Sequence, residues 1–372
     1  MADTQKNSAG NTADAQKSEG FGAKNRILWT IVFIVIAALS IWAVISQTGN
    51  FSFKSFAEFV KNSNPYWLAG AFISMLGFIF FEAFALIYIC RAFGYKTGLK
   101  SGFVYSAADI YVSAITPSAT GGQPASAYFM MKDGMPGTFV TAALICNLVM
   151  YTSAMVVLGL IAVLLSLKTF FGFGIISKLL IALGIVAQIG LLVFFIMVLL
   201  KKGLLEKLCA SVLKFLGKLH IIRKVDKKLA KLQKKMDAYS EHTSLLRGQG
   251  KLLFMVFIFN FLQRFCQILV TPLTYLASGG ELSKAVDVFI TQVYVVLGSN
   301  CVPIPGGMGV TDYLMLDGFE KLGIANYEFL ELFSRFLSFY MCIIICGITI
   351  LVSCVTYSDK ARSKKQKKQE AK

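Results

Sequence analysis

Two glycine-rich breaks are the most chemically distinctive features of the sequence. They read Pro117-Ser-Ala-Thr-Gly-Gly-Gln-Pro124 and Val302-Pro-Ile-Pro-Gly-Gly-Met-Gly309, and each interrupts a largely apolar segment. Proline and glycine interrupt helices, and the backbone groups that they free need polar partners within a membrane. Glycine also lets a ligand approach the backbone, and the half-helix that follows offers N–H donors and positive partial charge. An anionic phosphate would suit such a setting, although each break could simply kink its helix.

A few ionisable residues within apolar segments are the second candidates for chemistry. A charge at the centre of a bilayer costs on the order of 3 kcal/mol, so each should face the protein interior beside a partner. Arg264 and Arg335 could contact phosphate through bidentate hydrogen bonds, or could pair with Glu82, Asp109 or Asp312 as structural ion pairs. Asp312 could hold a cationic headgroup, or could cap the half-helix after the second break.

These features together define a predicted substrate-binding site. Its members are Glu82, Asp109, Ser118, Thr120, Gly121, Gly122, Gln123, Arg264, Asn300, Pro303, Pro305, Gly306, Gly307, Gly309, Asp312 and Arg335. No catalytic residues, cofactor or metal are expected, since the sequence has no Ser-His-Asp set in a plausible context and no Walker loop. The cysteines fall mostly within apolar segments and form no C-x-x-C, which is typical of buried free thiols.

Composition places the chain among membrane proteins. It has 372 residues, of which 56% are hydrophobic and only 15% charged, and its mean hydropathy is +0.65. A soluble domain of this length would need more charge to cover its surface. Segments long enough to cross a bilayer as a helix lie at 27–46, 67–90, 140–167, 175–200, 252–277 and 329–357. We therefore predict an all-α polytopic membrane protein with about six full spans.

The distribution of the net charge of +17 predicts the topology. Lysine and arginine concentrate in the linker 201–251 and in the tail 358–372, and the positive-inside rule places both in the cytoplasm. Residues 1–25 are polar and are expected to be disordered, also on the cytoplasmic side. The linker contains amphipathic helical patterns, which either lie on anionic inner-leaflet lipids or pack as a short helical hairpin. Nucleic-acid binding is not expected, because no aromatic-basic module accompanies the charge.

The two breaks are predicted to lie in re-entrant hairpins. The directions of the spans leave both ends of 101–133 in the cytoplasm and both ends of 284–323 outside, and each segment consists of two short apolar pieces around a break. The order span, broken hairpin, span thus occurs twice with opposite orientation, in a first membrane half at 26–200 and a second at 252–357. This order resembles the inverted repeats of secondary transporters, whose sites form where broken helices meet.

The sequence at the breaks resembles a known family. Thr116-Pro-Ser-Ala-Thr-Gly-Gly-Gln-Pro124 and Pro303-Ile-Pro-Gly-Gly-Met-Gly-Val-Thr-Asp312 are similar to the membrane region of lysylphosphatidylglycerol synthase/flippase proteins of the multiple peptide resistance factor type. The resemblance implies translocation of aminoacylated phosphatidylglycerol to the outer leaflet, with a separate cytosolic domain transferring lysine from lysyl-tRNA. That domain is missing from these 372 residues, so the transferase reaction is not expected of them. Gln123 and Asp312 stand where the family pattern usually has glutamate, which leaves the headgroup open.

The sequence therefore predicts a flippase-like lipid transporter of the bacterial cytoplasmic membrane. Its expected partners are a membrane phospholipid, anionic lipids at the basic linker, and a separate synthase or glycosyltransferase; a homodimer stays open. Alternatives are a membrane-embedded headgroup transferase using Glu82, Asp109 or Asp312, a scaffold for a separate synthase, a flippase for a glycolipid or polyprenyl-phosphate carrier, and a small-solute transporter.

Overall fold

The computed structural model describes residues 53–116, 119–200 and 248–370, together with a few positions in the linker. The expected first span at 27–46, the polar residues 1–25 and most of the linker 201–251 lie outside the described residues. The chain divides into two compact units, Met1–Ala57 and Glu58–Lys372, and the description below concerns the second unit. Helix α3 (Phe53–Lys61) includes residues on both sides of this boundary.

The described residues are helical and contain no strand, which confirms the predicted all-α polytopic class. Among them, 6 helical stretches are long and apolar enough to cross a membrane. Five coincide with expected spans, namely Pro65–Ala92 (α4), Gly137–Leu165 (α7), Ile175–Leu199 (within α9, Ile175–Leu200), Gly250–Ala277 (α12) and Tyr327–Thr356. The sixth, Leu282–Ser299, was expected as the first piece of the second hairpin. Its length is sufficient for a full crossing, so the re-entrant course stays a prediction.

Local sequence signals set the ends of α4. Asn64 precedes the helix and its side chain accepts a hydrogen bond from the Tyr66 backbone N–H at 3.0 Å, and Pro65 occupies the first helical position. At the other end, Gly94 adopts a φ of 83° and its N–H donates to the carbonyl of Arg91 at 3.0 Å. This left-handed glycine ends the helix and turns the chain towards the first hairpin.

Helices α4 and α12 form a central antiparallel pair. Gly70 lies opposite Leu273 near one end of the pair, and the rings of Phe84 and Phe259 lie 6.0 Å apart further along. Between these contacts, the Ser74 hydroxyl donates to the Cys266 carbonyl at 2.9 Å. Small residues and interhelical hydrogen bonds allow the close approach of membrane helices, because lipid provides little hydrophobic drive for their association.

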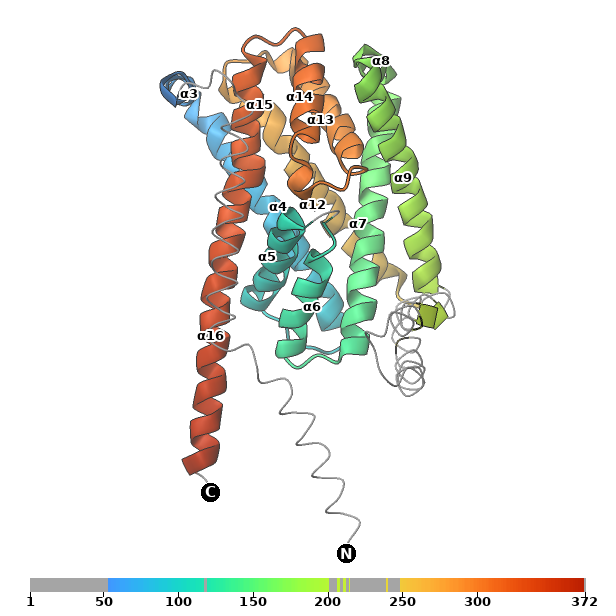
Figure 1. Cartoon of the computed structure of the whole chain (residues 1–372), viewed down its shortest axis with the longest axis vertical. Helices are drawn as coiled ribbons and strands as arrows, with labels where there is room; N and C mark the ends of the chain where they lie inside the picture. Colours follow the sequence, from blue (N-terminus) through green and yellow to red (C-terminus); the bar gives the residue numbers. More distant parts are fainter. Residues whose placement is uncertain are drawn as a thin grey trace, which may run out of the picture. The chain divides into compact units, whose positions relative to one another are not determined.

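Each helix of the central pair leads into a broken hairpin. Helix α4 is followed by α5 (Leu99–Ile115) and α6 (Gly122–Lys132), and α12 by α13 (Ala285–Ser299), η3 (Pro305–Gly307) and α14 (Val310–Lys321). Figure 1 shows α5 and α6 in the lower half of the bundle and α13 and α14 in the upper half. Segment η3 contacts α5, so the second break lies against a helix of the first hairpin. Helices α6 and α14 rise only about 16–18 Å, which is too short to cross a membrane alone.

The remaining helices pack around the hairpins. Helices α7 and α9, joined by α8 (Leu167–Gly172), lie side by side, and α9 also contacts α13 (Figure 1). At that contact a Cβ on Gly184 would collide with the backbone carbonyl of Leu297. The last crossing consists of α15 (Tyr327–Arg335), a π-helical segment η4 (Phe336–Met341) and α16 (Cys342–Glu370).

Replacement of Gly184 by alanine is expected to destabilise the contact between α9 and α13. The added methyl group meets backbone, which cannot rotate away as a side chain would, so we expect a loss of roughly 1–3 kcal/mol. The thermal melting temperature of the purified protein in detergent would report this loss. Gly190, on the same helix, is the matched control, because a Cβ there meets nothing within 4 Å. Equal melting temperatures for Gly184→Ala and Gly190→Ala would contradict this packing.

Candidate functional site

The first charged cluster lies where α4, α5, α6 and α12 meet. Glu82 of α4 and Asp109 of α5 are buried, and their carboxyl groups are in hydrogen-bonding contact. Oε2 of Glu82 accepts hydrogen bonds from Gln263 at 3.0 Å and from Ser106 at 3.2 Å. Oδ2 of Asp109 accepts one from the side chain of Gln123 at 2.8 Å. The acidic pair thus joins the central helices to the residue directly after the first glycine pair.

Backbone packing fixes this acidic pair against the first break. The Gly121 N–H donates to the Thr116 hydroxyl at 3.0 Å, so a side chain stabilises the turn between the half-helices. A Cβ on Gly122 would collide with Oδ1 of Asp109 and with the Ser113 hydroxyl. Glycine is therefore required at position 122 if the carboxyl group of Asp109 is to lie against the start of α6.

Arg264 faces the acidic pair from α12 but forms no ion pair with it within the described part of the chain. Its guanidinium carbon lies 3.6 Å from the ring centroid of Tyr151, a close cation–π stack. One terminal nitrogen donates to the side chain of Gln267, and Nε has no partner among the described residues. Arg264 is buried, and a buried donor normally has a hydrogen-bond partner. A ligand that enters the cluster could provide the partner that Nε lacks.

The second charged cluster surrounds the break between α13 and α14. Nε of Arg335 lies 2.8 Å from Oδ1 of Asp312, and the Arg335 guanidinium also donates to the Gly306 carbonyl at 3.4 Å. The other Asp312 oxygen accepts from the Gly309 backbone N–H at 2.9 Å. Gly306, Gly307 and Gly309 have φ values of 62°, 62° and 79°, which favour glycine over residues with a Cβ. Both structural roles considered for Asp312, the helix cap and the ion pair, are present.

Glu331 is a member of the second cluster that the sequence analysis missed. It is buried on α15 and interacts with both Asp312 and Arg335. Its spacing of four residues from Arg335 places the two on one face of the helix, which is the sequence signal that could have identified it. Each cluster therefore contains two carboxyl groups and one guanidinium group.

The other predicted site residues differ in their placement. Gln123 contributes to the first cluster, and Gly306 to the second. Asn300 and Pro303, at the start of the second break, have exposed side chains. Pro305 opens η3, the segment that contacts α5, and Thr120 is exposed in the first break. Ser118 lies outside the described residues. The sequence could not indicate Tyr151 and Gln267, which hold Arg264 in place, because their types are ordinary in apolar helices.

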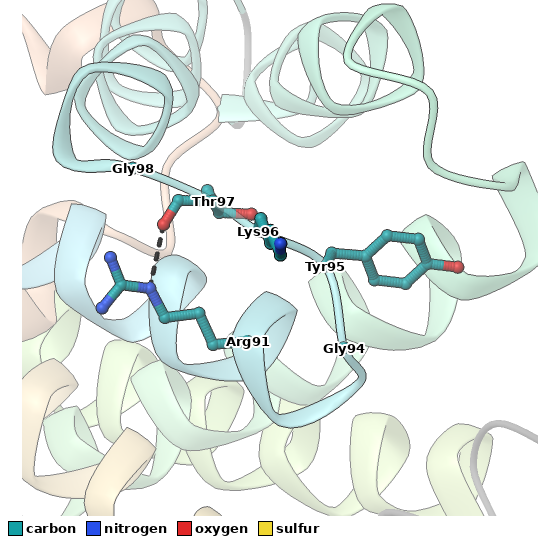
Figure 2. Close-up of a pocket in the computed structure, with 6 residues that line it drawn as sticks. All are labelled: Arg91, Gly94, Tyr95, Lys96, Thr97 and Gly98. Atoms are coloured by element: carbon teal, nitrogen blue, oxygen red, sulfur yellow. Dashed lines mark hydrogen bonds between the residues drawn. The ribbon is translucent and has the colours of Figure 1, made fainter.

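A separate shallow hollow lies at the loop between α4 and α5. Figure 2 shows its lining, from Arg91 to Gly98, with the Arg91 side chain donating to the Thr97 carbonyl at 2.9 Å. Its volume is about 480 Å³. Arg91 follows Glu82 by nine residues on the same helix, a rise of about 13 Å, so the hollow is distinct from the charged clusters.

Comparison with protein families identifies the membrane region. The model of the lysylphosphatidylglycerol synthase TM region matches residues 29–346. The chain belongs to this family. The matched range includes both glycine-rich breaks and every ionisable residue of the two charged clusters. The lysylphosphatidylglycerol synthase membrane region is lipid-related, and this chain is a multi-pass member of it. Searches of curated proteins and of solved structures return no match.

Removal of one partner of the Asp312–Arg335 pair is expected to destabilise the protein. Asp312→Asn removes the carboxylate that lies 2.8 Å from Arg335, and Arg335→Gln leaves Asp312 and Glu331 without a guanidinium group, so each should cost up to roughly 3–5 kcal/mol. The double variant should lose less than the sum of the two single losses, because the two groups interact directly with each other. Chemical unfolding of the purified protein would measure the three losses.

The exposed pair Glu320–Lys321 provides the control for this double-mutant cycle. Its side chains are 56% and 48% exposed and lie 3.9 Å apart, so Glu320→Gln should change the stability by less than about 1 kcal/mol. Strictly additive losses at positions 312 and 335 would show that the two charges do not interact.

Proposed function

We propose that this protein is a flippase-like lipid transporter of the bacterial cytoplasmic membrane. Its substrate in this proposal is a phospholipid such as aminoacylated phosphatidylglycerol, which moves between the leaflets. The supporting observation is that the second break lies against α5 of the first hairpin, and that each break has a buried charged cluster beside it. Membership of a lipid-related membrane family supports a lipid as the substrate.

The breaks suit a headgroup because they offer polar groups where the surrounding helices are apolar. The glycines of the second break expose backbone, and Arg264 retains an unused donor beside the first break. A lipid phosphate that reaches this point could accept a hydrogen bond from Arg264, while the acyl chains stay in the membrane. Arg335 would contact phosphate only by exchanging it for Asp312, since the two are paired at 2.8 Å.

Opposite orientation of the two halves provides a route for alternating access. Helices α4 and α12 are antiparallel, so the hairpins that follow them start from opposite ends of the pair. In the proposed cycle the halves rock about the α4–α12 contact and open the region of the breaks to one leaflet at a time. The basic linker and tail lie in the cytoplasm in this topology.

Reconstitution of the purified protein in vesicles would test the proposal. Fluorescently labelled phosphatidylglycerol and labelled lysylphosphatidylglycerol are followed by chemical quenching of the outer leaflet. We expect the protein to accelerate movement of at least one of them, and Arg264→Gln to slow it by about tenfold or more, because a hydrogen bond to a charged group contributes roughly 1.5–3 kcal/mol.

Lys168→Gln is the matched control, since Lys168 is an exposed cation on α8. Equal rates with and without protein for both lipids would end the transport proposal. Product formation from labelled phosphatidylglycerol in the same vesicles would instead favour the headgroup-transferase alternative.

Labelling of single cysteines would test the predicted course of the hairpins. Tyr128 and Tyr313 are partly exposed, at 46% and 43%, and each lies six residues after the second glycine of its break. In a background without the native cysteines, a membrane-impermeant maleimide should reach Tyr313→Cys in intact cells, but Tyr128→Cys only after permeabilisation. Labelling of both from one side would exclude two hairpins of opposite orientation.

A further inference from the structure

Glu82 and Asp109 place two buried carboxyl groups beside each other, with the Ser106 hydroxyl, one helical turn before Asp109, donating to Glu82 at 3.2 Å. An ionised carboxylate only accepts hydrogen bonds, so two carboxyl groups can hydrogen-bond to each other only if one of them carries a proton. Glu82 and Asp109 are in such contact, and only 4% and 7% of their surfaces are exposed. Two ionised carboxylates here would lie together in a place that water reaches poorly.

The charges that face the pair do not neutralise it when both acids are ionised. Arg264 on α12 interacts electrostatically with both acids, and the Cys346 thiol on α16 interacts with Glu82. Helices α6 and α7 present the uncharged side chains of Gln123 and Tyr151, and the short segment η3 contains only proline and glycine. Two carboxylates against one guanidinium leave one negative charge, and a buried unbalanced charge is costly.

Unused polar atoms next to the pair point to an exchangeable ligand. Among the described residues, Oε1 of Gln263 and Nε of Arg264 have no hydrogen-bond partner, and both side chains are more than nine-tenths buried. One is an acceptor and the other a donor, so together they can bind a water molecule or a polar headgroup beside the acids. No group of three potential metal ligands occurs among the described residues.

The acidic pair is connected to the first break by a hydrogen bond and by close packing. Asp109 accepts the hydrogen bond from Gln123, and its carboxyl group fills the space that a Cβ on Gly122 would need. A change in the protonation of Asp109 alters the hydrogen bonds at the start of α6. Because η3 contacts α5, this change occurs on the helix against which the second break lies.

We propose that Glu82 and Asp109 share a transported proton, so that lipid movement through this site is coupled to proton movement across the membrane. The inference rests on the proposed transport function and supplies its energy source. Each transport cycle protonates and deprotonates the pair from opposite sides as the halves rock. Carboxyl groups buried within membrane bundles commonly act as proton carriers.

A pH gradient across the reconstituted vesicles provides the test. The purified full-length protein is placed in vesicles with labelled phosphatidylglycerol or labelled lysylphosphatidylglycerol, and the membrane potential is clamped with potassium and valinomycin. With one proton moved per lipid, a gradient of one pH unit should shift the ratio of labelled lipid between leaflets by about tenfold at steady state. Reversal of the gradient should reverse the shift.

The outcomes separate this inference from the proposed function. A shifted and reversible leaflet ratio supports proton coupling. Lipid that moves but stays evenly distributed under every gradient overturns the coupling and leaves the transporter intact. Lipid that does not move with either label overturns the proposed function, and the inference with it.

Two variants test whether the acidic pair carries the proton that is coupled to lipid movement. Glu82→Gln and Asp109→Asn keep hydrogen-bonding capacity but cannot bind or release a proton in this range, so any lipid that these variants move should show a leaflet ratio of one under the gradient. A variant that moves lipid and keeps the tenfold bias would rule out its residue as a carrier. Glu320→Gln, at an exposed acid of α14, should keep the full bias.

Chemical labelling of the unmodified protein covers the case in which a variant fails to fold. A hydrophobic carbodiimide adds to protonated carboxyl groups within membranes, and mass spectrometry locates the adduct. We expect the adduct on Glu82 or Asp109, at a yield that falls as the pH rises. Labelling confined to other acids, or independent of pH, would overturn the assignment.

Discussion

The need to satisfy backbone polar groups at an interrupted helix determines how this bundle is built. Within a membrane, each unpaired N–H or C=O group costs several kcal/mol, because lipid offers no partner. In the first break the Thr116 hydroxyl accepts from the Gly121 N–H, and in the second Asp312 accepts from Gly309 while Arg335 donates to the Gly306 carbonyl. The polar side chains that close the breaks are therefore drawn to the interior, where the charged clusters form.

The two clusters have the same composition but different internal pairing. In the second, the guanidinium of Arg335 is paired with a carboxylate that also caps α14, so its charges stabilise the local structure. In the first, Arg264 stacks on Tyr151 and forms no ion pair with the two acids among the described residues. The guanidinium group of the first cluster thus lacks the paired carboxylate that the guanidinium group of the second cluster has. This difference is why we assign exchange of ligands to the first cluster.

The class of fold and the breaks were accessible from the sequence, because they depend on local signals. Apolar length predicts spans, and Gly121-Gly122 and Gly306-Gly307 mark backbone that regular helix cannot contain. The pairing of side chains was not accessible, since Glu82 and Gln263 are 181 positions apart and no local pattern relates them. The sequence could name Arg264 and Arg335 as equivalent candidates for phosphate, but only the packing distinguishes the paired guanidinium from the stacked one. Whether Leu282–Ser299 crosses fully or turns back depends on the position of the lipid, which neither residue type nor helix length determines.

The π-helical segment after Arg335 has a mechanical consequence. A π turn contains one residue more than an α turn, so it forms a bulge in an otherwise regular helix. If this bulge moves along the helix by one position, the residue at that position rotates about the helix axis by about 100°, while the helix ends keep their places. Arg335 directly precedes the π-helical segment, so a shift of the bulge by one position towards the N-terminus would rotate the Arg335 side chain first. The final helical stretch therefore has a point of rotation within it, directly beside the Asp312–Arg335 ion pair, which is shorter than the Glu320–Lys321 pair.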